Sequence, residues 1–330
     1  MTVASTRVHR QPVQGRNLGP FVLILGPTCS WIAVLASLLT GVSSSSLSIG
    51  PIPAVLALIA LAIGIPHGAA DHLTLVHALS LRGWFRLVVV YVSIAAAAAL
   101  SIIAFPVIGF VLVLAMTVWH FGTGDVQATA ELQGKTPITG GKRIIYALAL
   151  GSAPVLLPLT SPVAMSTVVS LEPRLALLYS GPAVTLVRVV VLTLIALTLV
   201  VLISRGAFRA AFELLTLAAL GLIASPFIAF AVYFGFWHAA RHTARLAQVT
   251  SGAVTVRSLA AVTKIGIPSL IGFIALLLAL TFFVGDDSLT GTVLWLGLAV
   301  VWGLTVPHMW CVSRFDQRLR VTLIPRSQPS

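Results

Sequence analysis

Ten long apolar segments constrain this chain more than any other feature of its sequence. Of its 330 residues, 58% are hydrophobic and 8% are charged, whereas soluble globular domains carry about 25% charged residues. About 20 apolar residues in a helix span the hydrocarbon core of a bilayer. We therefore predict an all-α, polytopic transmembrane bundle of about ten helices. The predicted crossings are 20–41, 52–76, 84–104, 106–123, 143–160, 182–203, 208–224, 226–247, 266–284 and 290–311.

Basic residues are unevenly distributed among the connections between these segments. The chain has 20 Lys and Arg residues against 8 Asp and Glu residues. With a cytoplasmic start, ten crossings leave Arg174 and Arg188 outside and place all other basic residues inside, as the positive-inside rule requires. The positive charge then faces anionic lipid headgroups rather than nucleic acid. We predict a multi-pass plasma-membrane protein with a disordered cytoplasmic arm over 1–19, a transmembrane domain over 20–312 and a basic cytoplasmic tail over 313–330.

Polar and proline-containing stretches give several local predictions. The residues between Asp125 and Arg143 predict a cytoplasmic loop, and 161–181 predict an outer loop with a short surface helix. Pro268 is expected at the entrance of its helix. Glu213 is a lone carboxylate near the inner end of its segment. It either anchors the helix at the interface or faces inward as the partner of a cation.

Seven of the eight histidines lie in apolar segments or at their ends, and His9 is the exception. A histidine or carboxylate buried in a membrane helix costs several kcal/mol unless it is paired. A proline inside a helix removes a backbone hydrogen bond, so the turn after Pro66 must face protein or a cavity. The polar residues occur in four motifs: PHGAADH (Pro66 to His72), WHFGTGD (Trp119 to Asp125), FGFWHAARH (Phe234 to His242) and TVPHM (Thr305 to Met309).

The predicted topology brings four of these histidines to a similar depth. His67, His120 and His238 lie about 24, 21 and 18 Å from the outer ends of their helices at 1.5 Å per residue. His242 follows His238 by one turn, which puts both rings on one face about 6 Å apart. A single histidine in a membrane helix is more often a hydrogen-bonded packing residue. The four together predict a metal site of imidazole ligands, which suits iron, copper, zinc or nickel.

Further polar residues near these motifs are candidates to orient the imidazole rings from an outer shell. At helical spacing Asp71 shares a face with His67, whereas His72 faces another neighbour. For His308 a ligand role, an outer-shell role and simple packing all remain open. The outer-shell candidates are Asp71, His72, Asp125, Arg241 and His308.

Aromatic residues are concentrated beside the same histidines. Each of them, taken alone, is explained by packing in the membrane core or at its interfaces. Taken together beside a metal, they fit an apolar tunnel for a long hydrocarbon. The candidate tunnel residues are Trp119, Phe121, Tyr233, Phe234, Phe236, Trp237 and Trp310.

The four motifs, in this order and spacing, resemble those of the Brp/Blh family of membrane β-carotene 15,15′-dioxygenases. The resemblance covers about thirty residues of the chain, spread from the second predicted helix to the tenth. It implies a membrane enzyme with non-haem Fe(II) that cleaves the central double bond of β-carotene with dioxygen, giving two molecules of retinal. It also implies that β-carotene enters from the bilayer and that an opsin-like protein receives the retinal.

Carried over by motif, the iron-binding histidines of that family fall on His67, His120, His238 and His242. Ala239 stands where a serine is common in the family, so the resemblance gives no hydroxyl role at that position.

Three other functions also use buried histidines. A haem-carrying electron-transfer protein would show a Soret absorption band. A membrane desaturase or hydroxylase would carry His-x-x-His-His boxes, which this sequence lacks. A proton-coupled transporter could use Asp71 and the histidines as a proton relay and would not consume dioxygen.

Overall fold

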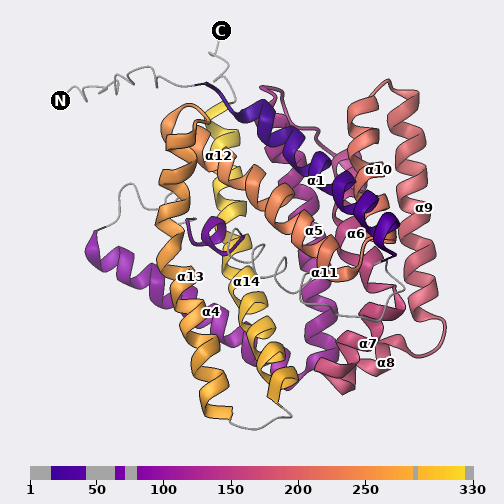
Figure 1. Cartoon of the computed structure of the whole chain (residues 1–330). Coiled ribbons are helices and arrows are strands. Elements are labelled where there is room, and N and C mark those ends of the chain that lie inside the picture. Colours follow the sequence, from indigo (N-terminus) through magenta and orange to yellow (C-terminus); the bar gives the residue numbers. More distant parts are fainter. Residues whose placement is uncertain (1–15, 42–63, 71–79, 285–288, 324–330) are drawn as a thin grey trace.

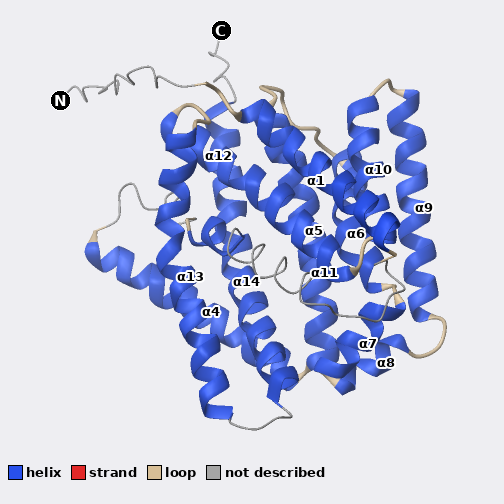
Figure 2. Cartoon of the chain, viewed as in Figure 1, coloured by secondary structure: helices blue, strands red, loops and turns tan. Residues whose placement is uncertain are grey.

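The computed structural model describes residues 16–41, 64–70, 80–284 and 289–323, and its regular elements are helices (Figure 2). The predicted all-α class is confirmed. Residues 64–69 form one helical turn and a half. The other helices are α1 (Gly19–Thr40), α4 (Leu81–Ala104), α5 (Pro106–Leu132), α6 (Gly141–Leu159), α7 (Pro162–Leu171), η1 (Pro173–Leu175), α8 (Ala176–Tyr179), α9 (Ala183–Ser204), α10 (Phe208–Ile223), α11 (Pro226–Ala231), η2 (Val232–Ala239), α12 (Ala240–Ser251), α13 (Val256–Val284) and α14 (Leu289–Leu323).

Seven of the described helices are long and apolar enough to cross a membrane: α1, α4, α5, α6, α9, and the greater parts of α13 and α14. Helix α10 has 16 residues and lies at the position of the predicted crossing 208–224. The predicted crossing 226–247 is divided among α11, η2 and α12. Much of the predicted crossing 52–76 lies outside the described residues. The structure is that of a helical membrane protein, and the count of about ten crossings remains a prediction.

The start of α1 and the end of α14 lie at the same end of the bundle (Figure 1). The backbone N–H of Leu18 donates to the carbonyl of Val254 at 2.7 Å, which holds the start of α1 beside the connection between α12 and α13. Helix α14 continues to Leu323, past the predicted boundary at residue 312. Phe315 is buried and Asp316 pairs with Arg245, so the first part of the predicted tail belongs to the bundle.

Apolar side chains cover both the inside and the outside of the bundle. A core among α1, α6, α10 and η2 buries Val34, Leu150, Leu214 and Trp237. Large apolar side chains are also exposed along the outer faces of α4, α9 and α13. In water such surfaces would be unstable, whereas lipid tails solvate them. The exposed faces therefore fit a bundle that is surrounded by bilayer.

Two further boundaries differ from the prediction. Helix α5 does not end at residue 123; it continues through Gly124 and Asp125 to Leu132. Helix α13 begins at Val256 and carries Pro268 inside it rather than at its entrance. A membrane helix tolerates glycine and proline because neighbouring helices can satisfy the backbone and fill the space. The predicted outer loop 161–181 contains α7, η1 and α8, as expected of a stretch with a short surface helix.

Glycines allow α5 and α6 to approach closely. A Cβ atom added to Gly122 would overlap the carbonyl of Ala147, and one added to Gly151 would overlap the carbonyl of Val118. Small residues at helix contacts permit this backbone approach in membranes. The contact fixes the part of α5 that carries His120 and Asp125.

Candidate metal centre

Five buried histidines from five elements gather in the interior of the bundle. His67 comes from the turn 64–69, His120 from α5, His238 from η2, His242 from α12 and His308 from α14. Each is at most 6% exposed. We call these five residues the histidine cluster. The structure thus brings together the four histidines expected to meet and adds His308 to them.

Ring contacts connect four members of the histidine cluster in a closed circuit. The ring centres of His120 and His238 are 5.2 Å apart, and those of His238 and His242 are 6.4 Å apart. The circuit continues from His242 to His308 at 5.7 Å and from His308 back to His120 at 4.8 Å. His67 lies against three of the four, at 5.6 Å from His238 and 5.3 Å from both His242 and His308.

These separations suit imidazoles that surround one ion. Ring nitrogens about 2.1 Å from a common metal place neighbouring ring centres roughly 4.5–6.5 Å apart, and the observed values run from 4.8 to 6.4 Å. Within the described residues, no group of three or more His, Cys, Asp or Glu side chains has its ligand atoms already close enough to hold an ion. Coordination would therefore require the rings to turn toward a common point. The residues fit a metal by type, burial and ring spacing.

Asp125 and Tyr233 hold the His238 ring from one side. The Nδ1 atom of His238 lies 3.3 Å from the Asp125 carboxylate, and the Tyr233 hydroxyl donates to the other carboxylate oxygen at 2.9 Å. A carboxylate at Nδ1 leaves Nε2 as the ligand nitrogen. The Nε2 atom of His238 is buried and has no hydrogen-bond partner among the described residues. A buried nitrogen in that state is expected where an ion binds.

The His67 ring is held by its own turn and by close neighbours. Its Nδ1 atom bonds to the carbonyl of Gly64, which again directs Nε2 away from the backbone. A Cβ atom added to Gly266 of α13 would overlap Pro66, and one added to Gly64 would overlap the Phe234 ring. Glycines on both sides therefore let α13 and η2 close around the turn that carries His67.

His238 lies in a π-helix. The eight residues of η2 form this wider turn between α11 and α12, and π-helical segments occur often at functional sites. The rings of His238 and His242 are nearly parallel, with 13° between their planes. The sequence spacing anticipated one shared face about 6 Å across, and the two ring centres lie 6.4 Å apart.

Four of the five candidate outer-shell residues divide into three groups, and the fifth, His308, is a member of the histidine cluster. Asp125 contacts a ring of the histidine cluster, as predicted. Asp71 and His72 lie outside the described residues. Arg241 does not orient a histidine in the contacts described. It donates instead to Thr129 at 2.9 Å and Glu213 at 3.2 Å.

The candidate tunnel residues also divide. Phe121 and Phe234 contact the histidine cluster, with ring centres 4.4 Å from His238 and 5.8 Å from His67 respectively. Tyr233 and Trp237 are buried. The Tyr233 ring stacks on His238 with ring centres 6.2 Å apart and its hydroxyl bonds to Asp125, whereas Trp237 lies under the Arg241 guanidinium at 4.4 Å. The remaining three lie nearer the surface: Phe236 is partly buried, and Trp119 and Trp310 are 44% and 49% exposed.

A second buried polar cluster lies on another face of α12, and the sequence analysis missed it as a unit. Arg245 donates to Glu131 of α5 at 2.5 and 2.9 Å and to Asp316 of α14 at 2.5 Å. Glu213 accepts from Arg241, so the second of its two expected roles, partner of a cation, is the one observed. The signal was present in the sequence: two arginines four residues apart in an otherwise apolar bundle. We call Arg241, Arg245, Glu131, Glu213 and Asp316 the arginine cluster.

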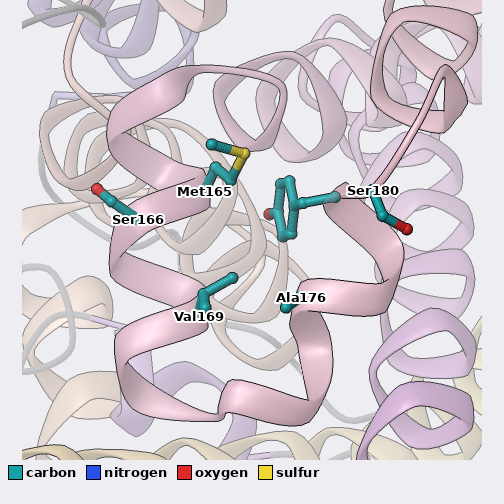
Figure 3. Close-up of a pocket in the computed structure, with 6 residues that line it drawn as sticks. Met165, Ser166, Val169, Ala176 and Ser180 are labelled. Carbon is teal, nitrogen blue, oxygen red and sulfur yellow. The ribbon is translucent and has the colours of Figure 1, made fainter.

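The hollows on the surface lie away from the histidine cluster. One, with a volume of about 300 Å³, lies between α7 and α8. Met165 and Val169 line one wall and Ala176 the other (Figure 3). A second hollow lies at the start of α4, around Trp84 and Phe85. Neither is lined by a histidine, so the interior histidine cluster is the better candidate site.

Comparisons with known proteins give a family match and a relative that covers most of the chain. A family model described as "Beta-carotene 15,15′-dioxygenase" matches residues 58–316, a range that contains all five members of the histidine cluster. The chain is 29% identical to a protein of Halobacterium salinarum named "Probable beta-carotene 15,15′-dioxygenase Blh", over 92% of this chain and 94% of that protein. No solved structure is similar enough to count as a match.

Proposed function

Because the chain belongs to the β-carotene 15,15′-dioxygenase family, we propose that it opens the central double bond of β-carotene with dioxygen at an iron ion held by His67, His120, His238 and His242. Membership makes the protein an oxygenase of this kind, and its apolar helices make it a membrane protein. The proposal adds the ion, its ligands and the use of dioxygen. One molecule of β-carotene and one of dioxygen balance two molecules of retinal.

One observation carries the proposal: four buried imidazoles from separate elements lie close together, with neighbouring ring centres 5.2–6.4 Å apart. Neutral imidazoles are suited to iron, and bound iron would supply the reactivity toward dioxygen that the protein itself lacks. The protein's contribution is to hold the rings. Asp125 fixes the His238 ring through Nδ1, and Tyr233 fixes Asp125. No side chain is needed as an acid or a base.

Three phenylalanines support a route for the polyene from the bilayer. Phe230 is 37% exposed, and its ring stacks on Phe234 at 5.1 Å. Phe234 lies 6.2 Å from Phe121, which contacts His238. These three rings form a packed apolar row from a partly exposed position to the histidine cluster. An apolar route of this kind would exclude water and place the middle of a long hydrocarbon beside the rings.

Location and partners belong to the same proposal. We place the protein in the plasma membrane with its basic face toward anionic lipids, because its Lys and Arg residues far outnumber its acids. β-Carotene would come from the bilayer, and an opsin-like acceptor would take the retinal.

Expression in a host that accumulates carotene tests the function. Wild-type protein should bleach the orange cells and produce retinal, and His238→Ala should abolish both. His9→Ala, outside the apolar segments, is the matched control and should behave as wild type. Unchanged pigment with wild-type protein correctly inserted and iron supplied would contradict the proposal. A Soret band in the purified protein would point to haem instead.

A further inference from the structure

His308 occupies a corner of the histidine cluster that the four predicted ligands leave open. The circuit of ring contacts from His120 through His238 to His242 closes only through His308. His308 is also 5.3 Å from His67, the ring that lies against the circuit. It is 6% exposed, like the other members. By position, therefore, His308 is equivalent to the rings around it rather than external to them.

The facing nitrogen atoms give the distance expected of neighbouring ligands. The Nε2 atoms of His308 and His120 are 3.1 Å apart. Two nitrogens bound about 2.1 Å from one ion lie about 3.0 Å apart at a right angle and about 3.4 Å apart at a tetrahedral angle. A hydrogen bond from one ring to the other would give a similar distance, so the experiment has to separate these two states.

The fold holds the His308 ring in this corner. Gly68 lies beside the ring: a Cβ atom added there would lie 3.4 Å from Nδ1 of His308, an ordinary van der Waals contact. Helix α14 is fixed against α4 by close approach, because a Cβ atom added to Gly303 would lie 2.5 Å from the carbonyl oxygen of Ala95. This close approach holds the helix that carries the ring.

We propose that His308 is a fifth imidazole ligand of the metal. This inference rests on the proposed function, since it assumes that the histidine cluster binds iron. The number of open coordination positions would then differ. A six-coordinate ion with five imidazole ligands would have one position left for another molecule, whereas one with four would have two.

The test compares metal binding in the full-length, detergent-purified wild type and His308→Ala, prepared without oxygen. Iron affinity is measured by competition with a chelator, and Co(II) is bound in place of iron to report the coordination number from its visible absorption. Leu304→Ala, on the exposed side of α14 one turn earlier, is the matched control. Size-exclusion chromatography confirms that each variant is folded.

Loss of a ligand should weaken iron binding by more than the roughly 10–100-fold that loss of an outer-shell partner costs. The Co(II) bands should intensify as the coordination number falls, and added imidazole should restore the wild-type affinity and spectrum by filling the space left by His308. A smaller loss with an unchanged Co(II) spectrum and no rescue would overturn the fifth ligand and leave the proposed function intact. A wild type that binds no iron would overturn the proposed function itself.

Discussion

Helix α12 and the π-helix before it contribute to two buried polar clusters. The polar groups of the two clusters find their partners in different ways. In the arginine cluster, the Arg245 guanidinium meets two carboxylates at 2.5 Å, and Arg241 meets Glu213 at 3.2 Å. In the histidine cluster, the described residues bring five rings together with one carboxylate, Asp125. With Arg209, which also pairs with Glu213, the arginine cluster matches three guanidiniums to three carboxylates. The histidine cluster instead holds a buried nitrogen, Nε2 of His238, that has no hydrogen-bond partner among the described residues.

The difference indicates separate roles for the two clusters. A buried charge is tolerated when it is paired and hydrogen-bonded, so the paired guanidiniums can brace α5, α10, α12 and α14, although Nε of Arg241 and Nη1 of Arg245 are buried without a partner among the described residues. Buried nitrogens without donors are unfavourable, and His238 Nε2 has no partner among the described residues. A cation would satisfy this nitrogen. The comparison therefore favours the histidine cluster as the proposed metal site and the arginine cluster as its support.

The largest expected effect on stability comes from breaking the brace. Arg245→Met leaves Glu131 and Asp316 with no guanidinium between them, and removal of one partner of a buried pair costs about 3–5 kcal/mol of unfolding free energy. Chemical unfolding in detergent measures the loss. Arg209→Met is the control: its side chain is 52% exposed, and the loss of such a pair costs about 0–1 kcal/mol. Folded Arg245→Met should still bind iron. An Arg245→Met variant with normal stability that no longer binds iron would show that the arginine cluster serves metal binding rather than support.

The next effect concerns the positioning of His238. Asp125→Asn should weaken iron binding roughly 10–100-fold, the usual cost of losing an outer-shell carboxylate. Tyr233→Phe should act in the same direction but less, since it removes one hydrogen bond to Asp125. Chelator competition measures both variants, with Tyr179→Phe in α8 as control. Unchanged affinity in Asp125→Asn would show that the carboxylate does not orient the ring.

A substitution on α5, two residues after His120, tests whether the α5–α6 contact supports the fold around the histidine cluster. Gly122→Ala should lower the unfolding free energy by about 1–3 kcal/mol, the usual cost of overpacking, because its Cβ atom would overlap Ala147. Gly272→Ala is matched in chemistry, and a Cβ atom there would meet nothing within 4 Å. Equal stability of the two variants would remove the argument for a close contact.

The smallest effect involves an ion pair outside the crossings in which the Glu172 side chain is buried and the Arg174 side chain is exposed. Hydrogen bonds from the Arg174 side chain hold the pKa of Glu172 below its usual value. A lowered pKa stabilises the fold fully above the unfolded value of about 4.3, and this stabilisation is lost as the pH falls through the lower, folded value. Hydrogen exchange around α7 and α8 should increase over that range. Glu172→Gln should remove the dependence, and a pH response that survives in it would contradict this assignment.

The sequence allowed prediction of those parts of the fold that depend on hydropathy. Segment lengths located α1, α6 and α9 to within about two residues. They placed the end of α5 too early, because Gly122 and Gly124 suggest a loop in isolation but serve close packing in the bundle. Chain order alone could not reveal that a π-turn would interrupt the crossing that carries His238.

The candidate site, like the fold, was predictable only in those parts that local geometry determines. Motif spacing and helix depth anticipated that His67, His120, His238 and His242 would meet, since both depend on local geometry. The role of His308 was left open, because the depth of this residue in its helix did not distinguish a metal ligand from a packing neighbour. The partners of Arg245 come from positions 131 and 316, and only the tertiary structure brings residues so far apart in sequence together.

X-ray absorption at the iron edge tests the central claim most directly. The account predicts about one iron per chain in the purified, full-length protein, with a first shell of imidazole nitrogen atoms and the outer scattering typical of histidine rings. Iron absent from the wild type, or bound through thiolate or porphyrin, would contradict it.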